Sequence, residues 1–271
     1  MKLGDHAIRN GELISPKEAV LPVTQREVQS NFSVYEALRI IEKKVVHLPE
    51  HLQRLKESAR EIRLEHSFSD QMIASSIGKL IETDCITEAT MRILIVGGPE
   101  PVLFITASPI LSYPPSMYRD GVFCTVYEGE RFMPECKTSN LLLNYIALED
   151  SKRRGGFEAL LLDHNGCIRE GTRSNFYGFR DQILYTAPLD VVLDGITRQS
   201  VLKAAAEIGI KVAEKALRYS ELKECDEVFI SSTSMSAMPV RQVEDIVFSS
   251  DHQRTLRLSE IVRNRELDAK V

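Results

Sequence analysis

Two short segments of the sequence carry residue types that suit the binding of a phosphate or another anion. Residues 194–197 (DGIT) place a glycine and a hydroxyl where a helix is expected to begin. The N–H groups at a helix start are unpaired and the helix dipole adds partial positive charge, so such a terminus attracts phosphate. Residues 231–234 (SSTS) follow an apolar run and could add hydroxyl donors. Each segment has an ordinary alternative, an Asp-capped helix and a polar turn respectively.

Two ionisable residues stand in surroundings that could serve chemistry. Glu170 is followed by residues 171–175 (GTRSN), which are rich in hydrogen-bonding groups, and Lys137 lies between a cysteine and a threonine. A carboxylate at a turn and a lysine are both, in most proteins, solvated surface residues. Neither residue on its own therefore predicts catalysis.

The elements that must position these residues follow from hydrophobic periodicity and from turn residues. Helices are expected over residues 50–64 and 140–154, and a third helix is expected to open at Gly195 and end near Gly209. The expected strands are residues 34–41, 91–96, 102–107, 158–162, 167–170, 175–179, 182–187 and 228–231. The pattern predicts a mixed α and β protein.

A proline-rich stretch divides the chain. Residues 109–115 contain three prolines, which can continue neither a helix nor a central strand. We therefore expect an N-terminal α/β domain over residues 1–107, a linker over residues 108–120, and a C-terminal α/β domain over residues 121–271 that carries Lys137.

The composition is that of a water-soluble enzyme, with 43% hydrophobic and 27% charged residues and a net charge of -5. No block of like charge suggests binding to nucleic acid or to a membrane surface. The N-terminus lacks the apolar core of a signal peptide, and no apolar run is long enough to span a bilayer. The five cysteines form no Cys-x-x-Cys pair, which argues against a zinc site and for a reducing compartment. We expect a cytoplasmic protein without a bound metal.

Taken together and in order, the short motifs resemble those of the class IV, or fold-type IV, aminotransferases, which depend on pyridoxal 5'-phosphate (PLP). That family holds branched-chain aminotransferases, D-amino-acid transaminases and aminodeoxychorismate lyases. The matching segments are residues 34–39 (VYEALR), 51–59 (HLQRLKESA), 137–142 (KTSNLL), 170–176 (EGTRSNF), 195–198 (GITR) and 232–233 (ST). The resemblance extends from about residue 20 to residue 245.

The resemblance implies a fold, a cofactor and a role for each matching residue. The fold would be α+β, with two mixed α/β domains of the D-amino-acid aminotransferase-like architecture, and the protein would be a homodimer. Lys137 is similar to the Schiff-base lysine that also moves the substrate proton, and Glu170 to the carboxylate that meets the pyridine nitrogen. The implied phosphate cradle and cofactor contacts are Arg54, Ser174, Asn175, Ile196, Thr197, Ser232 and Thr233. The residues implied or considered on the substrate side are Tyr35, Arg39, Arg173 and Ser234.

The substrate is less well defined by the sequence. Where D-amino-acid transaminases and the lyases typically end a strand in an arginine, this chain reads Ile95-Val96-Gly97-Gly98. Arg173 or Arg39 could replace that arginine in binding a substrate carboxylate, and Arg173 could equally be a surface residue on a turn. Apolar candidates near the pocket (Tyr35, Ala37, and Met235 or Met238) favour an aliphatic side chain.

The favoured function is therefore transfer of an amino group from a small aliphatic, possibly branched-chain, amino acid to a 2-oxo acid such as 2-oxoglutarate by a ping-pong mechanism. A D-amino-acid transaminase and an aminodeoxychorismate lyase, which eliminates pyruvate, remain alternatives on the same scaffold. A non-catalytic relative or a simple phosphate-binding module would leave Lys137 and Glu170 without a role.

Overall fold

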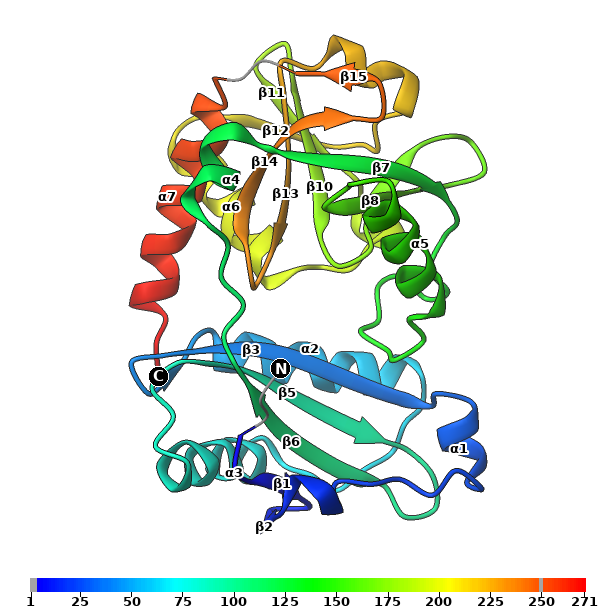
Figure 1. Cartoon of the computed structure of the whole chain (residues 1–271), viewed down its shortest axis with the longest axis vertical. Coiled ribbons are helices and arrows are strands. Elements are labelled where there is room, and N and C mark those ends of the chain that lie inside the picture. Colours follow the sequence, from blue (N-terminus) through cyan, green and yellow to red (C-terminus); the bar gives the residue numbers. More distant parts are fainter. Residues whose placement is uncertain (1–3, 249–250) are drawn as a thin grey trace. The chain divides into compact units, whose positions relative to one another are not determined.

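The computed structural model describes residues 4–248 and 251–271 and divides into two compact units (Figure 1). Unit 1 holds Met1–Leu111, Cys136–Asn140 and Glu266–Val271, and unit 2 holds Ser112–Glu135 and Leu141–Arg265. Unit 1 is therefore made of three separate segments of the chain. The segment with Lys137 belongs to unit 1, whereas the sequence placed it in the C-terminal domain, because this segment pairs with a strand of unit 1.

Unit 1 is built on a six-stranded antiparallel sheet with the strand order β2-β1-β6-β5-β3-β4. Its strands are β1 (Ala7–Arg9), β2 (Glu12–Ile14), β3 (Ser33–Ile41), β4 (Lys44–Val45), β5 (Ala89–Val96) and β6 (Val102–Ser108). The three strands predicted in this part of the chain are β3, β5 and β6. The predicted connection between β5 and β6 is confirmed as an antiparallel hairpin.

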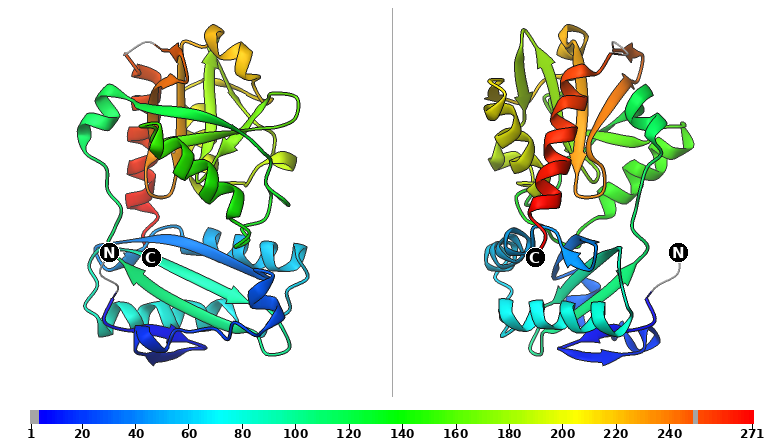
Figure 2. Two further views of the ribbon diagram at one scale, coloured as in Figure 1. Left: turned by 45° about the vertical axis from the view of Figure 1, so that its right-hand side comes forward. Right: turned by 90° about the vertical axis from the view of Figure 1, so that its left-hand side faces the viewer.

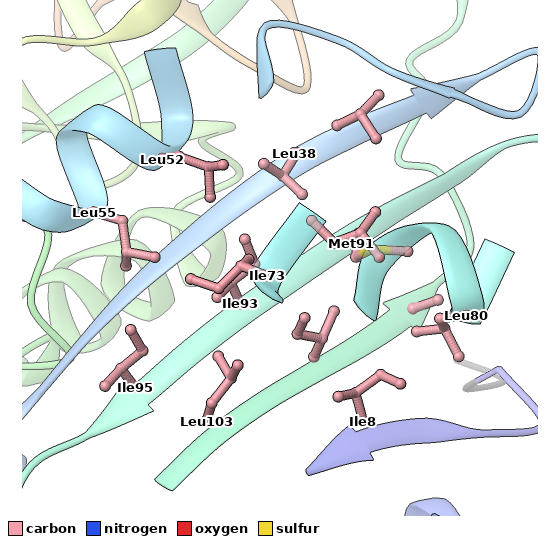
Figure 3. Close-up of a cluster of buried hydrophobic side chains, with 14 of the residues drawn as sticks. Ile8, Leu38, Leu52, Leu55, Ile73, Leu80, Met91, Ile93, Ile95 and Leu103 are labelled. Carbon is pink, nitrogen blue, oxygen red and sulfur yellow. The ribbon is translucent and has the colours of Figure 1, made fainter. Parts of the chain in front are cut away.

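Two helices, α2 (Leu48–Glu61) and α3 (Asp70–Thr83), cover one face of this sheet (Figures 1 and 2). A short α1 (Arg26–Gln29) and the 3-10 turn η1 (Pro16–Glu18) precede β3. The core between helices and sheet is aliphatic, as Figure 3 shows for Leu38, Leu52, Ile73 and Ile93. Strand alternation fixes what faces the core, because successive side chains of a strand point to opposite faces.

Unit 2 contains a nine-stranded sheet in the order β12-β11-β10-β13-β14-β7-β8-β9, with β15 paired to β14. An additional pairing of β9 with β10 closes six of these strands into a ring. The bounds are β7 (Val122–Glu128), β8 (Glu158–Leu162), β9 (Ile168–Gly171), β10 (Asn175–Arg180), β11 (Ile183–Thr186), β12 (Lys211–Glu214), β13 (Glu227–Ser232), β14 (Ser236–Val243) and β15 (Ile246–Val247). The strands expected at β8, β9, β10, β11 and β13 are confirmed.

The helices of unit 2 are α4 (Pro115–Asp120), α5 (Leu142–Arg153), α6 (Ile196–Glu207) and most of α7 (Gln253–Asp268), with 3-10 turns η2 (Leu189–Val191) and η3 (Tyr219–Glu224). The expected linker over residues 108–120 thus contains a helix. Pro114 is the N-cap of α4 and Pro115 its first residue, where a proline removes no hydrogen bond.

Helix α5 confirms the prediction over residues 140–154, but its apolar residues are not all buried. Leu142 is 67% exposed, Tyr145 66% and Ile146 43%. These three residues lie at helical spacing and form one exposed apolar face, which we call the α5 face. Within the part of the chain that the structure describes, no helix has the length and apolar character needed to cross a membrane.

Candidate active site

The backbone around Lys137 is held by two elements of unit 1. Tyr35 of β3 donates its N–H to the carbonyl of Lys137 at 3.0 Å, and the N–H of Ser139 donates to the carbonyl of Ser33 at 3.1 Å. The N–H of Lys137 donates to Ser58 Oγ of α2 at 3.0 Å. The lysine segment therefore forms an isolated antiparallel bridge to the start of β3, in which both backbone groups of Lys137 are hydrogen-bonded.

The amine of Lys137 lies against the ring of Tyr35, with Nζ 4.7 Å from the ring centroid. The guanidinium of Arg92, on β5, lies 4.0 Å from the same centroid. Arg92 pairs with Ala37 across the two strands, so Tyr35, Ala37 and Arg92 share the face of the sheet opposite to α2 and α3. This face therefore combines an amine, an aromatic ring and an exposed guanidinium.

Arg54, the expected phosphate ligand on α2, is bound to a buried carboxylate of β3. Its Nε lies 2.7 Å from Glu36 Oε1 and its Nη2 lies 2.8 Å from Glu36 Oε2. His51 Nδ1 lies 2.7 Å from Glu36 Oε2. The Glu36 side chain has no exposed surface, and that of His51 is only 1% exposed. We call these three residues the Glu36 cluster.

Two pKa shifts describe the charge state of the Glu36 cluster. Burial raises the pKa of the Glu36 carboxyl, but the charge of Arg54 and the hydrogen bonds from Arg54 and His51 outweigh burial, so the pKa lies well below its usual range. Burial lowers the pKa of His51, and Glu36 offsets only part of this effect. At neutral pH the cluster therefore consists of an ionised Glu36, a charged Arg54 and a neutral His51.

Arg39, the other arginine on β3 considered for the substrate, lies in an ion pair. Its Nη1 is 2.7 Å from Glu266 Oε2 near the end of α7, and the Glu266 side chain is 7% exposed. The expected alternation is confirmed, because Tyr35, Ala37 and Arg39 share one face of β3. The side chains placed at the Tyr35 ring are those of Lys137 and Arg92.

Glu170 is the next-to-last residue of β9 in unit 2 and is almost completely buried. Its Oε1 accepts a hydrogen bond from Arg131 Nε at 2.7 Å, and its Oε2 accepts one from the N–H of Leu193 at 3.3 Å. The neighbouring strands continue this row, because Asn175 of β10 pairs with both Glu170 and Ser231 of β13. The carboxylate is thus held rigidly at the shared end of three strands.

The predicted anion site at the start of α6 is next to this row of strands. Gly195 is the N-cap and has no side chain to cap the helix. Asp194, which the sequence allowed as a cap, instead faces Arg198 and Gln199 at 3.4 and 3.0 Å. Gly195 thus offers no side chain to the N–H groups that open α6, and a helix start of this kind can bind an anion such as a phosphate.

Asn175 connects the anion site to the Glu170 row. Its Nδ2 donates to the carbonyl of Leu193 at 2.9 Å, and a Cβ added to Gly195 would lie 2.2 Å from its Oδ1. A side chain at position 195 would therefore have to displace the side chain of Asn175. Asn175, Ile196 and Thr197 are all buried.

The serine-rich turn between β13 and β14 is compact. Ser232 Oγ and Ser234 Oγ lie 3.2 Å apart, and the N–H of Met235 donates to the carbonyl of Ser232 at 3.1 Å. Ser232, Thr233 and Ser234 are half-buried. The sequence suggested Met235 or Met238 as a substrate contact. The structure does not support this prediction, because both side chains are completely buried in the core of unit 2.

The turn after Glu170 is hydrogen-bonded to the carboxylate of Glu158 on β8. Thr172 donates to this buried carboxylate through its N–H at 3.1 Å and through its hydroxyl, and Ser174 Oγ donates at 3.1 Å. Arg173 packs over the Phe157 ring at 5.2 Å and lies 3.6 Å from Glu158. Ser174 and Arg173 therefore support this turn.

The structure thus gathers Lys137, Tyr35 and Arg54 in unit 1, and Glu170, Asn175, Ile196 and Thr197 in unit 2. Three residues next to them received no role from the sequence: Glu36, Arg92 and Arg131. Of these three, only Glu36 could have been noticed from the local sequence, because it is a charged residue in a row of apolar residues on the covered face of β3. The partners of Arg92 and Arg131 come from distant parts of the chain.

Comparison with known proteins agrees with this geometry. The family model described as "Amino-transferase class IV" matches residues 33–243. The chain belongs to the class IV aminotransferase family. It is therefore a PLP-dependent enzyme, and its fold is that of the fold-type IV aminotransferases.

Relatives within the family carry two kinds of name. The D-alanine aminotransferase of Bacillus licheniformis is 30% identical over 247 residues, which cover 87% of each chain. The branched-chain-amino-acid aminotransferase of Escherichia coli K12 is 30% identical over 268 residues, covering 90% of this chain and 87% of that protein. A crystal structure of the Escherichia coli branched-chain amino acid aminotransferase has a TM-score of 0.87 and 29% identity, covering 95% of this chain and 93% of that chain.

Proposed function

We propose that this class IV aminotransferase transfers the amino group of a small aliphatic amino acid to a dicarboxylic 2-oxo acid such as 2-oxoglutarate, with Lys137 as the catalytic base. The observation that carries the proposal is the pairing of a fixed lysine amine with an exposed arginine at one aromatic ring. Lys137 and Arg92 both contact Tyr35, on a face that also offers the small apolar Ala37.

The residues of unit 2 fit the remaining parts of PLP. Glu170 is a buried carboxylate with its orientation fixed by Arg131 and Leu193, and it would hold the proton on the pyridine nitrogen. The uncapped start of α6, at Ile196 and Thr197, would bind the phosphate together with Ser232 and Thr233. In unit 1, Arg54 would add a charged donor.

When bound, PLP supplies an electron-poor ring that takes up the electron pair of the substrate Cα–H bond. Lys137 would hold the cofactor in the resting enzyme and would release it when the amino group of the substrate takes its place. As a neutral amine it removes the Cα proton and returns a proton to the C4′ position of the cofactor. Water would then release the first product, a 2-oxo acid, while the amino group stays on the cofactor until the second substrate binds, so we expect ping-pong kinetics.

Arg92 is our candidate for recognising a carboxylate. An arginine offers planar, bidentate hydrogen bonding to carboxylates. Arg39 is paired with Glu266, and Arg173 is held by Glu158, whereas Arg92 lies exposed on the face that holds the Lys137 amine. Arg92 thus takes the role that the sequence offered to Arg39 or Arg173.

A second candidate function is transamination of D-amino acids. The supporting observation is that a D-alanine aminotransferase is as similar to this chain as a branched-chain aminotransferase, at 30% identity in both cases. Because Lys137 would remove the Cα proton from the same side of the cofactor in both cases, the two functions would differ in where the side chain and the carboxylate of the substrate lie. The framework of Lys137 and Glu170 serves both.

The α5 face leads us to propose that a second copy of the chain binds there, which gives the homodimer expected from the sequence. Leu142 and Tyr145 are two-thirds exposed on this face. Exposed apolar side chains at helical spacing gain free energy when a partner covers them. Changing Tyr145 to Glu should convert the dimer to a monomer in sedimentation analysis, and an unchanged dimer would reject this interface.

The experiment for the catalytic proposal follows the cofactor spectrum. The purified protein with PLP should absorb at about 410–420 nm, and Lys137→Ala should lose this band. Single L- and D-amino acids are then added without an acceptor. Bleaching by one equivalent of L-leucine or L-valine supports the aliphatic L-transaminase, bleaching by D-alanine supports the second candidate, and catalytic release of pyruvate from aminodeoxychorismate without an acceptor would instead support the lyase.

A further inference from the structure

Glu36 is a carboxylate that is completely buried, and burying a charged group costs free energy. It lies on the face of β3 that α2 and α3 cover, between Val34 and Leu38, which are both completely buried. An ionised carboxylate in such surroundings is strongly disfavoured unless charged or polar partners satisfy it. The partners of Glu36 must therefore offset the free-energy cost of burying its charge.

The partners of Glu36 are Arg54 and His51, and the contacts define their orientation. Arg54 uses its Nε and one Nη2 hydrogen for Glu36, at 2.7 and 2.8 Å, which are two of the five N–H donors of a guanidinium. This fixes the plane of the guanidinium and the direction of its other donors. His51 donates from Nδ1, because an ionised carboxylate only accepts, so its Nε2 is the acceptor of the neutral ring.

The same helix face also anchors the lysine. His51, Arg54 and Ser58 follow each other on one side of α2, and Ser58 Oγ accepts the N–H of Lys137. The two side-chain bonds from Arg54 and the one from His51 attach this side of α2 to β3, which also binds the backbone of Lys137 through Tyr35. Arg54 and Lys137 are therefore both positioned by the same two elements, α2 and β3.

We propose that Glu36 is a positioning residue of the cofactor site, which holds the Arg54 guanidinium in the orientation that receives the phosphate of PLP. The inference rests on the proposed function, in which Arg54 binds this phosphate. Without Glu36, the arginine side chain would lose two hydrogen bonds that set its orientation, and more of the cost of ordering it would fall on phosphate binding.

The test compares binding of two cofactor forms to the apoprotein by equilibrium titration of the 410–420 nm band. PLP carries the phosphate and pyridoxal lacks it, while both react with Lys137. In Glu36→Gln we expect PLP to bind roughly 10- to 100-fold more weakly, as for other residues that orient a ligand-binding group, and pyridoxal to bind as in the wild type. In the double variant with Arg54→Gln, the loss should not exceed that of Arg54→Gln alone.

The controls separate this inference from the proposed function. If Arg54→Gln weakens PLP but not pyridoxal, and Glu36→Gln weakens neither, Glu36 does not position the arginine. If Arg54→Gln weakens neither form, the phosphate role of Arg54 itself fails. An equal loss for PLP and pyridoxal in Glu36→Gln would also overturn the inference, because it indicates damage to the lysine rather than to phosphate binding.

A conservative variant covers the case in which Glu36→Gln does not fold. Glu36→Asp keeps the charge but withdraws the carboxylate by one methylene group, so that it cannot keep both hydrogen bonds to Arg54 at their present lengths. It should show the same loss that is selective for PLP, and unchanged PLP affinity in this variant would reject the proposal. Glu42→Gln, which changes an exposed acid paired with Lys270, is the matched control and should leave both affinities unchanged.

Discussion

Arg92 lies on β5, and its guanidinium contacts the ring that also contacts the amine of Lys137. If Arg92 binds the second carboxylate of a dicarboxylic 2-oxo acid, Arg92→Leu should raise the KM for 2-oxoglutarate by about tenfold or more, as expected for a lost charged hydrogen bond. The KM for a monocarboxylic 2-oxo acid should change much less. The measurement is steady-state kinetics with both acceptors.

Arg9 provides the control for Arg92. It is exposed on the same face of the sheet, where it packs over Phe104 at 5.9 Å. Arg9→Leu removes the same charge from the same surface and should leave both KM values unchanged. Equal effects of the two substitutions would show that only the general charge of this face matters.

The ion pair of Arg131 and Glu170 is buried, with 8% and 7% of the side chains exposed. Arg131→Gln leaves a buried carboxylate without its charged partner, which we expect to lower the free energy of unfolding by about 3 kcal/mol. Urea denaturation of the apoprotein measures this change. Arg119→Gln, in an exposed pair with Asp120 in which Arg119 is 74% exposed, should leave the free energy of unfolding unchanged within the error of the measurement.

His51 makes stability dependent on pH. Its folded-state pKa is lowered from 6.5 by burial, so below pH 6.5 the unfolded state takes up a proton that the folded state does not. Its contribution to stability is therefore complete above pH 6.5 and falls as the pH decreases towards the folded-state pKa. His51→Asn should flatten the decline in melting temperature below pH 6.5, and two parallel profiles would contradict the assignment.

For single residues, the sequence allowed those that lie in known motifs to be recognised, but it did not show which residues contact each other. Lys137, Glu170 and Gly195 could be recognised because several short motifs occur in a family-like order. Arg131 could not, because its partner Glu170 lies 39 residues away and no spacing rule connects them. Arg92 was passed over because an arginine was sought at the end of β5, whereas it lies within that strand.

At the scale of elements, the strands with clear alternation and turn residues were predicted well. The hairpins β5–β6 and β10–β11 and helix α2 all follow from local sequence. Strand β14 was missed, since it contains Pro239, which argues against a central strand. The pairing with β7 begins only at Val240, so Pro239 lies beyond the end of β7 on that side.

Helix α3 was not predicted, although Ile73, Ile77 and Leu80 have helical spacing and are buried. It contains Gly78, around which an added Cβ would meet nothing within 4 Å. Gly78→Ala should therefore stabilise the protein by up to about 1 kcal/mol, because alanine favours helix and restricts the unfolded chain. Thermal unfolding of the apoprotein is the measurement.

Gly121→Ala is the contrasting substitution for Gly78→Ala. Gly121 has a φ of +71°, and a Cβ there would lie 2.8 Å from the backbone nitrogen of Arg241. This substitution should lower the melting temperature. If both alanine variants changed the melting temperature in the same direction, local space and backbone conformation would not decide the effect of glycine here.

At the scale of the whole molecule, unit 1 depends on residues from the far end of the sequence. Val45 of β4 exchanges backbone hydrogen bonds with Val271 at 2.9 and 3.0 Å, and the N–H of His47 donates to the carbonyl of Ala269. Arg39 pairs with the buried Glu266. Sequence patterns could not show this arrangement, because the prediction of domains assumed that each one is a continuous stretch of chain.

Removal of residues 266–271 should therefore destabilise unit 1. The deletion leaves Arg39 without its ion-pair partner and β4 without its backbone bonds to Val271, and we expect a loss of about 3 kcal/mol or more in the free energy of unfolding. Lys270→Ala, which removes the pair with the exposed Glu42, should leave the free energy of unfolding unchanged within the error of the measurement. Equal stability of the deletion variant and the wild type would contradict this role.

The three entries of the chain into unit 1 also bear on its biosynthesis. The N-terminal part of a nascent protein usually begins to fold while later residues are still being added. Here the segment bearing Lys137 and the backbone partner of β4 at residues 269–271 leave the ribosome long after β1 to β6. The growing polypeptide must keep this first sheet open at β4 until residue 271 has been translated, so unit 1 cannot be completed before all of unit 2 has been synthesised.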